Sequence, residues 1–174
     1  MILIYAFSNQ WGTNISTRTL LELQGLPSLS KEGLGVDFIF QKILKYPHPF
    51  FNEYIRNKQY TAIIGLGDIY GDFDKIKIET QANNLYGRHS ILPNAPSNIN
   101  LDLPYFESID NSKFYLSQNM GTYNCNWIAY QIQSYINQKS LTCYHLFFHL
   151  PPKSKAGDNA KSIADLLITN RVLQ

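Results

Sequence analysis

The chain has 174 residues, of which 44% are apolar and 14% are aromatic. This composition excludes general disorder and allows one domain, spanning residues 1–174, with a substantial core. Fifteen basic and 13 acidic residues give a formal net charge of +2, which argues against nucleic acid or an anionic membrane as a partner.

The apolar segment from Met1 to Phe7 has no basic leader and is too short for a signal peptide or a membrane span. We expect it to form a first buried strand. The two cysteines, Cys125 and Cys143, fall in different predicted elements, so a disulfide has no special support. A reduced cytoplasmic protein is the simpler interpretation.

Apolar runs of strand length alternate with segments of helical period along the chain. The predicted strands cover residues 2–7, 36–40, 60–67, 76–79, 114–117 and 141–150. The predicted helices cover 15–23, about ten residues from Pro47, 126–136 and 161–173. This alternation predicts an α/β sandwich with a largely parallel sheet, whose ligand sites lie beyond the carboxyl ends of strands.

Residues 83–111 contain three prolines and many asparagines without a sustained period. We therefore expect a long connecting loop, which either covers a site or forms a flexible insertion. Earlier in the chain, Gly65 and Gly67 follow an apolar run, but no third glycine or Gly-Lys-Ser/Thr ending comes after them. A nucleotide site at these glycines is therefore disfavoured.

Cys125 is the candidate nucleophile, because it stands where a helix is expected to begin. The helix macrodipole, free N–H groups and a protonated histidine would all lower the pKa of its thiol. The alternative is a small buried apolar residue, a common environment for free cysteine. Cys143, inside an apolar strand, is expected to be structural.

His149 is the candidate base, because it lies where a predicted strand gives way to two prolines. His145 lies four residues earlier on the same face, so the period of a strand does not choose between the two histidines. Glu79 would orient the imidazole as the third member of a triad. No tight cluster of metal-ligand residues is present, so we expect no metal site.

Three ordered motifs resemble the pyroglutamyl peptidase I (pyrrolidone-carboxylate peptidase) family. Residues 121–126 match its Gly-x-Tyr-x-Cys-Asn motif, residues 149–151 its His-Val/Leu-Pro motif, and residues 79–84 its Glu-x-x-Ala-x-Asn motif. The resemblance covers most of the chain and implies a three-layer α/β/α sandwich with a largely parallel, mixed central sheet. It also implies a cofactor-free, cytoplasmic cysteine peptidase, a possible homo-oligomer, that removes an N-terminal pyroglutamyl residue from small peptides.

Under this resemblance Cys125, His149 and Glu79 match the catalytic positions, while Trp11 and Asn84 match candidate substrate-binding positions. Trp11 would stack on the substrate's lactam ring, although a core position is the alternative for a large aromatic residue. Asn84 lies at the last motif position, although asparagines in such segments often hydrogen-bond within their own loop.

The chain also departs from the family and looks shortened. Ser8 and Trp11 stand where the family usually has phenylalanine, Asn119 replaces a common aspartate, and no arginine lies between Gly67 and Glu79. These changes alter the pocket and leave the triad intact. Two alternatives therefore stay open: a non-catalytic peptide-binding scaffold, and a hydrolase of another small amide.

Overall fold

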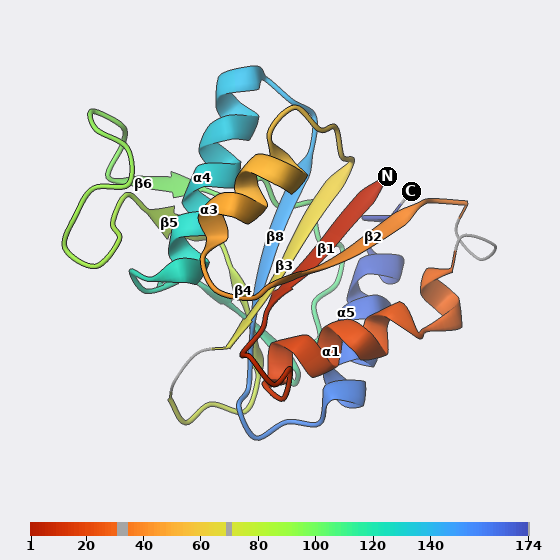
Figure 1. Cartoon of the computed structure of the whole chain (residues 1–174). Coiled ribbons are helices and arrows are strands. Elements are labelled where there is room, and N and C mark those ends of the chain that lie inside the picture. Colours follow the sequence, from red (N-terminus) through yellow and green to blue (C-terminus); the bar gives the residue numbers. More distant parts are fainter. Residues whose placement is uncertain (31–34, 69–70, 174) are drawn as a thin grey trace.

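The computed structural model describes residues 1–30, 35–68 and 71–173 (Figure 1). The strands in these ranges are β1 (Ile2–Phe7), β2 (Phe38–Ile43), β3 (Ala62–Asp68), β4 (Ile76–Glu79), β5 (Gln81–Asn83), β6 (Asn98–Asn100), β7 (Phe114–Ser117) and β8 (Tyr144–Leu150). The helices are α1 (Ile15–Gln24), the 3₁₀ helix η1 (Pro27–Leu29), α3 (Pro47–Phe50), the π-helical η2 (Phe51–Ile55), α4 (Asn124–Lys139) and α5 (Ala156–Thr169).

The main sheet of the described strands has the order β2-β1-β3-β8-β4-β7. Strands β2, β1, β3 and β8 are parallel, β4 runs antiparallel to β8, and β7 is parallel to β4. The sheet is therefore mostly parallel but mixed, as predicted.

Helices cover both faces of this sheet (Figure 1). One core lies between the sheet and helices α1 and α5, and the other lies between the sheet and helices α3, η2 and α4. Alternate residues of β1 face the two cores: Ile2 and Ile4 belong to the first, Leu3 and Tyr5 to the second. The arrangement is a three-layer α/β/α sandwich, which confirms the expected fold class.

Gly65 and Gly67 let other groups lie directly on β3. A Cβ atom on Gly65 would stand 2.7 Å from the Tyr5 ring, and one on Gly67 would stand 2.9 Å from both the Cys125 Sγ and the Phe147 ring. Glycine in a strand often marks such a close approach. These glycines therefore accommodate side chains from β1, β8 and α4.

The expectation of a strandless loop over 83–111 is wrong in part. β5 and β6 pair as an antiparallel two-stranded sheet, which contacts α4. Both strands are only three residues long, and β6 has the polar sequence Asn-Ile-Asn. Their period is too short to be visible in the sequence.

Several boundaries shift relative to the sequence-based expectations. β2 begins at Phe38, two residues later than expected, and α5 begins at Ala156, five residues earlier. Val172 is buried as expected but lies beyond the end of α5. None of the helices in the described ranges is both long and apolar enough to cross a membrane.

Candidate active site

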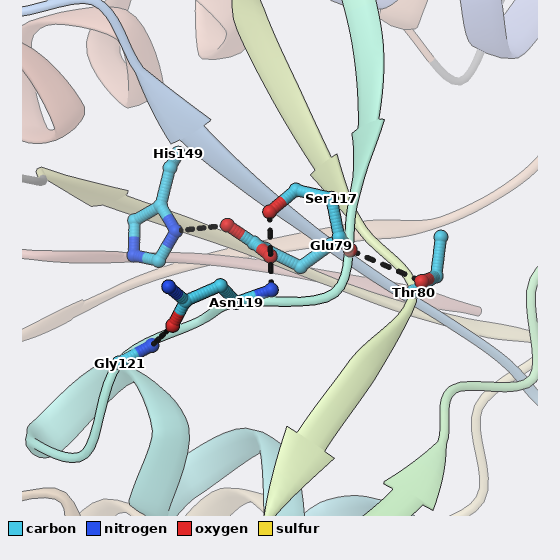
Figure 2. A network of polar contacts seen from close by, with 6 residues as sticks. All are labelled: Glu79, Thr80, Ser117, Asn119, Gly121 and His149. Atoms are coloured by element: carbon cyan, nitrogen blue, oxygen red, sulfur yellow. Dashed lines mark hydrogen bonds and ion pairs between the residues drawn. The ribbon is translucent and has the colours of Figure 1, made fainter.

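Glu79 of β4 and His149 of the neighbouring strand β8 form a buried pair (Figure 2). Glu79 Oε1 lies 2.7 Å from His149 Nδ1, and both residues are at most 1% exposed. The second carboxylate oxygen, Oε2, is buried and has no hydrogen-bond partner within the described ranges. The carboxylate therefore acts on the imidazole, fixing its orientation and favouring a proton on Nδ1.

The direction of β4 explains how Glu79 reaches the histidine. Because β4 is antiparallel to β8, Lys77 pairs with His149 and Ile78 with Phe148. Glu79 therefore lies further from the carboxyl edge of β8 than His149 does. Its side chain therefore extends toward the carboxyl end of β8 to make the contact with His149.

Cys125 is the second residue of α4, and its sulfur lies over β3. Sγ is 2.9 Å from the position of a Cβ on Gly67, which pairs with His149 on the neighbouring strand. Neighbouring strands are about 4.8 Å apart, so the thiol and the imidazole occupy adjacent positions on one face. No hydrogen bond joins the Cys125 and His149 side chains among the described residues.

The environment of Cys125 keeps its thiol protonated. Burial raises the pKa of the Cys125 thiol well above its usual value, and the carboxylates of Asp68 and Glu79 raise it further. The expectation of a lowered thiol pKa is therefore wrong. A neutral thiol that served as a nucleophile would have to transfer its proton during attack rather than beforehand.

A short network holds the turn that leads into α4 (Figure 2). The Asn119 N–H donates to Ser117 Oγ at 3.2 Å, and its Oδ1 accepts from the Gly121 N–H at 3.3 Å. Gly121 has a φ of 79°, a conformation that favours glycine. Asn119 therefore fixes the approach to Cys125 through one contact of its backbone and one of its side chain.

Trp11 lies in the loop between β1 and α1 and is 74% exposed, so it is not a core residue. The Asn9 Oδ1 accepts hydrogen bonds from the backbone N–H groups of Trp11 and Thr13. At the other end of the loop, Asp68 accepts from Asn14 and from the Ser16 N–H. These contacts tie the Trp11 loop to the end of β3, beside the strand position over which Cys125 lies.

Asn84 closes the loop that follows β5. Its Oδ1 accepts from the Leu92 N–H at 2.8 Å, and its Nδ2 donates to the carbonyl oxygens of Leu92 and Ala95. This is the loop-bonding alternative considered for this residue, and the side chain is nearly fully buried. A role of Asn84 toward substrate stays a prediction.

Sequence reasoning missed the role of Asn126, which follows the cysteine in the motif. Its Oδ1 accepts from the Asn83 N–H, and its Nδ2 donates to the carbonyl oxygens of Asn83 and Leu85. Asn126 thus holds the end of β5 against the first turn of α4. These hydrogen bonds explain why a fully buried asparagine follows the candidate nucleophile.

Lys77 is a second residue whose position beside His149 the sequence reasoning did not identify. It lies directly opposite His149 across the β4–β8 pair, and its alternation with Glu79 along β4 is visible in the sequence. Among the residues that the structure describes, no three His, Cys, Asp or Glu side chains are grouped closely enough to hold a metal ion.

No known family model matches the sequence, and no curated protein matches it either. Solved structures do match. Pyroglutamyl peptidase I from Bacillus amyloliquefaciens superposes with a TM-score of 0.79 at 18% identity, over 97% of this chain and 93% of that chain.

Two further enzymes show the same similarity. Pyrrolidone carboxyl peptidase from Fervidobacterium islandicum gives a TM-score of 0.77 at 18% identity, covering 98% of this chain and 97% of that chain. The enzyme from Thermococcus litoralis gives 0.74 at 14% identity, covering 98% and 92%. The chain therefore has the fold of the pyroglutamyl peptidases, the family that its three motifs resemble.

Proposed function

We propose that this chain is a cysteine peptidase that removes an N-terminal pyroglutamyl residue from small peptides. The observation that carries the proposal is the buried Glu79–His149 pair, 2.7 Å apart, beside the strand position over which Cys125 lies. A carboxylate, an imidazole and a thiol in this order form a hydrolytic triad. The peptidase fold of the whole chain supports the same class of reaction.

In the proposed first step, the Cys125 sulfur attacks the carbonyl carbon of the pyroglutamyl residue while its proton passes to His149. A carbon–sulfur bond forms, and the carbonyl oxygen becomes an oxyanion. Tyr123, the N-cap of α4, makes no side-chain cap hydrogen bond, so N–H groups of the first turn are available to the oxyanion. Such donors each contribute on the order of 10²- to 10³-fold in comparable sites.

In the next step, the imidazolium of His149 gives its proton to the leaving nitrogen. The carbon–nitrogen bond breaks, and the peptide leaves with a free amino group. His149 then takes a proton from water as the water attacks the thioester, and pyroglutamic acid is released with the thiol restored. Glu79 balances the positive charge on the ring whenever the ring carries both protons.

Trp11 is assigned to the lactam ring of the substrate in this proposal, and Asn84 to the wall of the pocket. The exposure of Trp11, 74%, favours a second candidate in which the same machinery hydrolyses another small amide, because the residues that the structure describes do not enclose the indole. The raised pKa of the Cys125 thiol is the observation that favours a non-catalytic, peptide-binding protein.

Turnover of a pyroglutamyl fluorogenic amide distinguishes the candidates. We expect turnover in the wild type and in Cys143→Ala, and its loss in Cys125→Ala; Cys143 is the matched control because it is the other free cysteine. Turnover that survives Cys125→Ala, or a wild type that hydrolyses no blocked amide, would contradict the proposal. A panel of N-terminally blocked amides tests the shifted substrate.

A further inference from the structure

Neighbouring strands place a row of groups across the face of the sheet covered by α4. Gly67 pairs with His149, His149 with Lys77, and Lys77 with Tyr115. Residues directly opposite one another point to the same face of a sheet, and the Cys125 sulfur covers the glycine. From β3 to β7 the cross-strand row therefore reads thiol, imidazole, ammonium and phenol.

The order of this row gives a direction to a bound substrate, if the proposed function holds. The acyl carbon must lie at the Cys125 sulfur, and the leaving nitrogen must lie where His149 can protonate it. The loop with Trp11 follows β1, on the β1 side of the thiol, and takes the acyl group. The leaving group then extends toward the opposite side, where Lys77 is the next residue of the row.

The ammonium of Lys77 is held in place without an anionic partner. Its Nζ lies 4.6 Å from the centroid of the Phe73 ring and 5.9 Å from that of Tyr115, and cation–π contacts of this kind orient a lysine. In the described ranges it makes no ion pair and no hydrogen bond. Nearby lysines differ: Lys75 donates to a backbone oxygen, and Lys153 pairs with a carboxylate.

A half-buried ammonium next to a candidate general acid suits an anion close to the scissile bond. In a leaving amino acid, the carboxylate begins two bonds from the nitrogen that His149 protonates, so its oxygens lie roughly 3 Å from that nitrogen. Residues directly opposite on neighbouring strands have Cβ atoms about 4.5–5.5 Å apart. The side chains of His149 and Lys77 therefore start from adjacent positions, from which they can reach the nitrogen and the carboxylate of one residue together.

Space for the side chain of such a residue lies on the other side of Phe73, whose ring contacts the Lys77 ammonium. A cavity of about 420 Å³ begins at Phe73, the ring that holds the ammonium, and continues past the end of β8. Its lining is Asp72, Phe73, Asp74, Pro151, Lys153 and Ser154.

We propose that Lys77 binds a carboxylate on the leaving residue, so that the preferred substrates are pyroglutamyl amino acids with a free carboxyl group. In a longer peptide, or in an amide, this group is neutral and the charge-assisted contact is lost. An acidic side chain on the leaving residue offers the same chemistry from a different position. This inference rests on the proposed function and names the leaving group that the site prefers.

The test compares kcat/KM for pyroglutamyl-alanine, its C-terminal amide, and the amide of pyroglutamyl-glutamate. We expect the free acid to exceed the alanine amide by about tenfold at low ionic strength, the ratio typical of one charge-assisted contact. In Lys77→Met this ratio falls to about twofold or less, chiefly through a higher KM for the free acid, while Lys77→Arg keeps most of it. A rate on the glutamate amide equal to that on the alanine free acid would show that a side-chain carboxylate serves as well, and would overturn the preference for a free carboxyl group.

Lys75→Met is the matched control, because it removes a half-buried lysine two positions earlier on the chain that donates to the Asn111 carbonyl oxygen, and it should keep the wild-type ratio. Equal rates on acid and amide in the wild type, or an unchanged ratio in Lys77→Met, would overturn the inference even though the peptidase proposal stands. Calorimetric binding of the free acid and of the alanine amide to Cys125→Ala tests the inference about Lys77 separately from the peptidase proposal. Tighter binding of the free acid to Cys125→Ala, lost when Lys77→Met is added, supports the inference even if no substrate is hydrolysed. Equal binding of the free acid and the amide to Cys125→Ala overturns it.

Discussion

Two histidines on β8 occupy nearly equivalent positions and have different partners. His145 and His149 are four residues apart, face α4, and are at most 1% exposed. The Nδ1 atom of His149 lies 2.7 Å from a carboxylate oxygen of Glu79, whereas that of His145 lies 3.1 Å from the amide oxygen of Gln133. One strand therefore presents the same ring in two chemical settings.

The partner decides what each ring can do. An amide oxygen fixes the tautomer of His145 but brings no charge, and burial lowers the pKa of His145 to about 3. That ring stays neutral and serves the structure. A carboxylate beside His149 balances a positive charge, so that ring can accept and return a proton during a reaction.

His145 belongs to a network that anchors the segment between β6 and β7. The Gln133 side chain donates to the Asp102 carboxylate at 2.6 Å and accepts from the Asp102 backbone N–H. The backbone N–H of His145 donates to the Asp102 carbonyl oxygen. The Nε2 atom of His145 has no partner within the described ranges. His145 therefore holds the segment around Asp102 near the start of β8, whereas His149 belongs to the candidate site near the end of the strand.

The largest expected effect comes from exchanging each ring for asparagine. His149→Asn removes the general acid and base, and we expect kcat to fall by about 10³- to 10⁴-fold on a pyroglutamyl amide. His145→Asn keeps a donor near the Gln133 oxygen and should change kcat by less than about threefold, because it lies outside the site. If His145→Asn lost more activity than His149→Asn, the assignment of the base would be wrong.

Glu79→Gln converts the setting of His149 into that of His145. The amide can still accept a hydrogen bond from the ring but cannot balance its charge, so we expect kcat to fall by about 10²- to 10³-fold. Orienting acids in such triads cost less when removed than the base does. Steady-state kinetics measure the loss, and circular dichroism checks the fold. Activity within twofold of the wild type would show that the carboxylate does not support the reaction.

Much of the fold follows from local sequence, and the exceptions have physical causes. Strands such as β1 and β7 appear as apolar or alternating runs, and α4 as a periodic segment. β5 and β6 were missed because their stability comes from α4 and from the side chain of Asn126, which are distant in sequence. The start of α5 was placed too late because its first turn is polar and lacks the apolar repeat.

The candidate site shows the same division. Motif spacing led to Cys125, His149 and Glu79, but strand period could not separate His149 from His145, since the deciding partner lies 70 residues away. The direction of the thiol pKa was predicted wrongly because burial and the Asp68 carboxylate are tertiary properties. Lys77 was overlooked because only the β4–β8 register shows that it faces His149.

The neutral state of His145 predicts a pH dependence of stability. Burial lowers its pKa from 6.5 to about 3, so between these values the unfolded chain binds a proton that the folded chain excludes. The free energy of unfolding should therefore fall as the pH falls below about 6.5, with a slope of up to about 1.4 kcal/mol per pH unit. Above that pH the contribution is constant.

His145→Asn removes this contribution and should flatten the profile. Urea denaturation between about pH 5 and 7 measures the slope, in a range where most carboxyl groups are still ionised. His145→Asn and the wild type should then converge as the pH falls. Parallel profiles would mean that the buried ring does not exclude the proton.

The smallest expected effect tests the network rather than the rings. Gln133→Met leaves the His145 Nδ1, the Asp102 N–H and the Asp102 carboxylate without their shared partner, and we expect the free energy of unfolding to fall by about 1–3 kcal/mol. The matched control is Gln138→Met on the exposed side of α4, which should change it by less than about 0.5 kcal/mol. Of the two histidines, Gln133 contacts only His145, so kcat should stay at the wild-type level. A drop in kcat as large as that of Glu79→Gln, with stability unchanged, would mean that the two ends of β8 are coupled and that the histidines do not act separately.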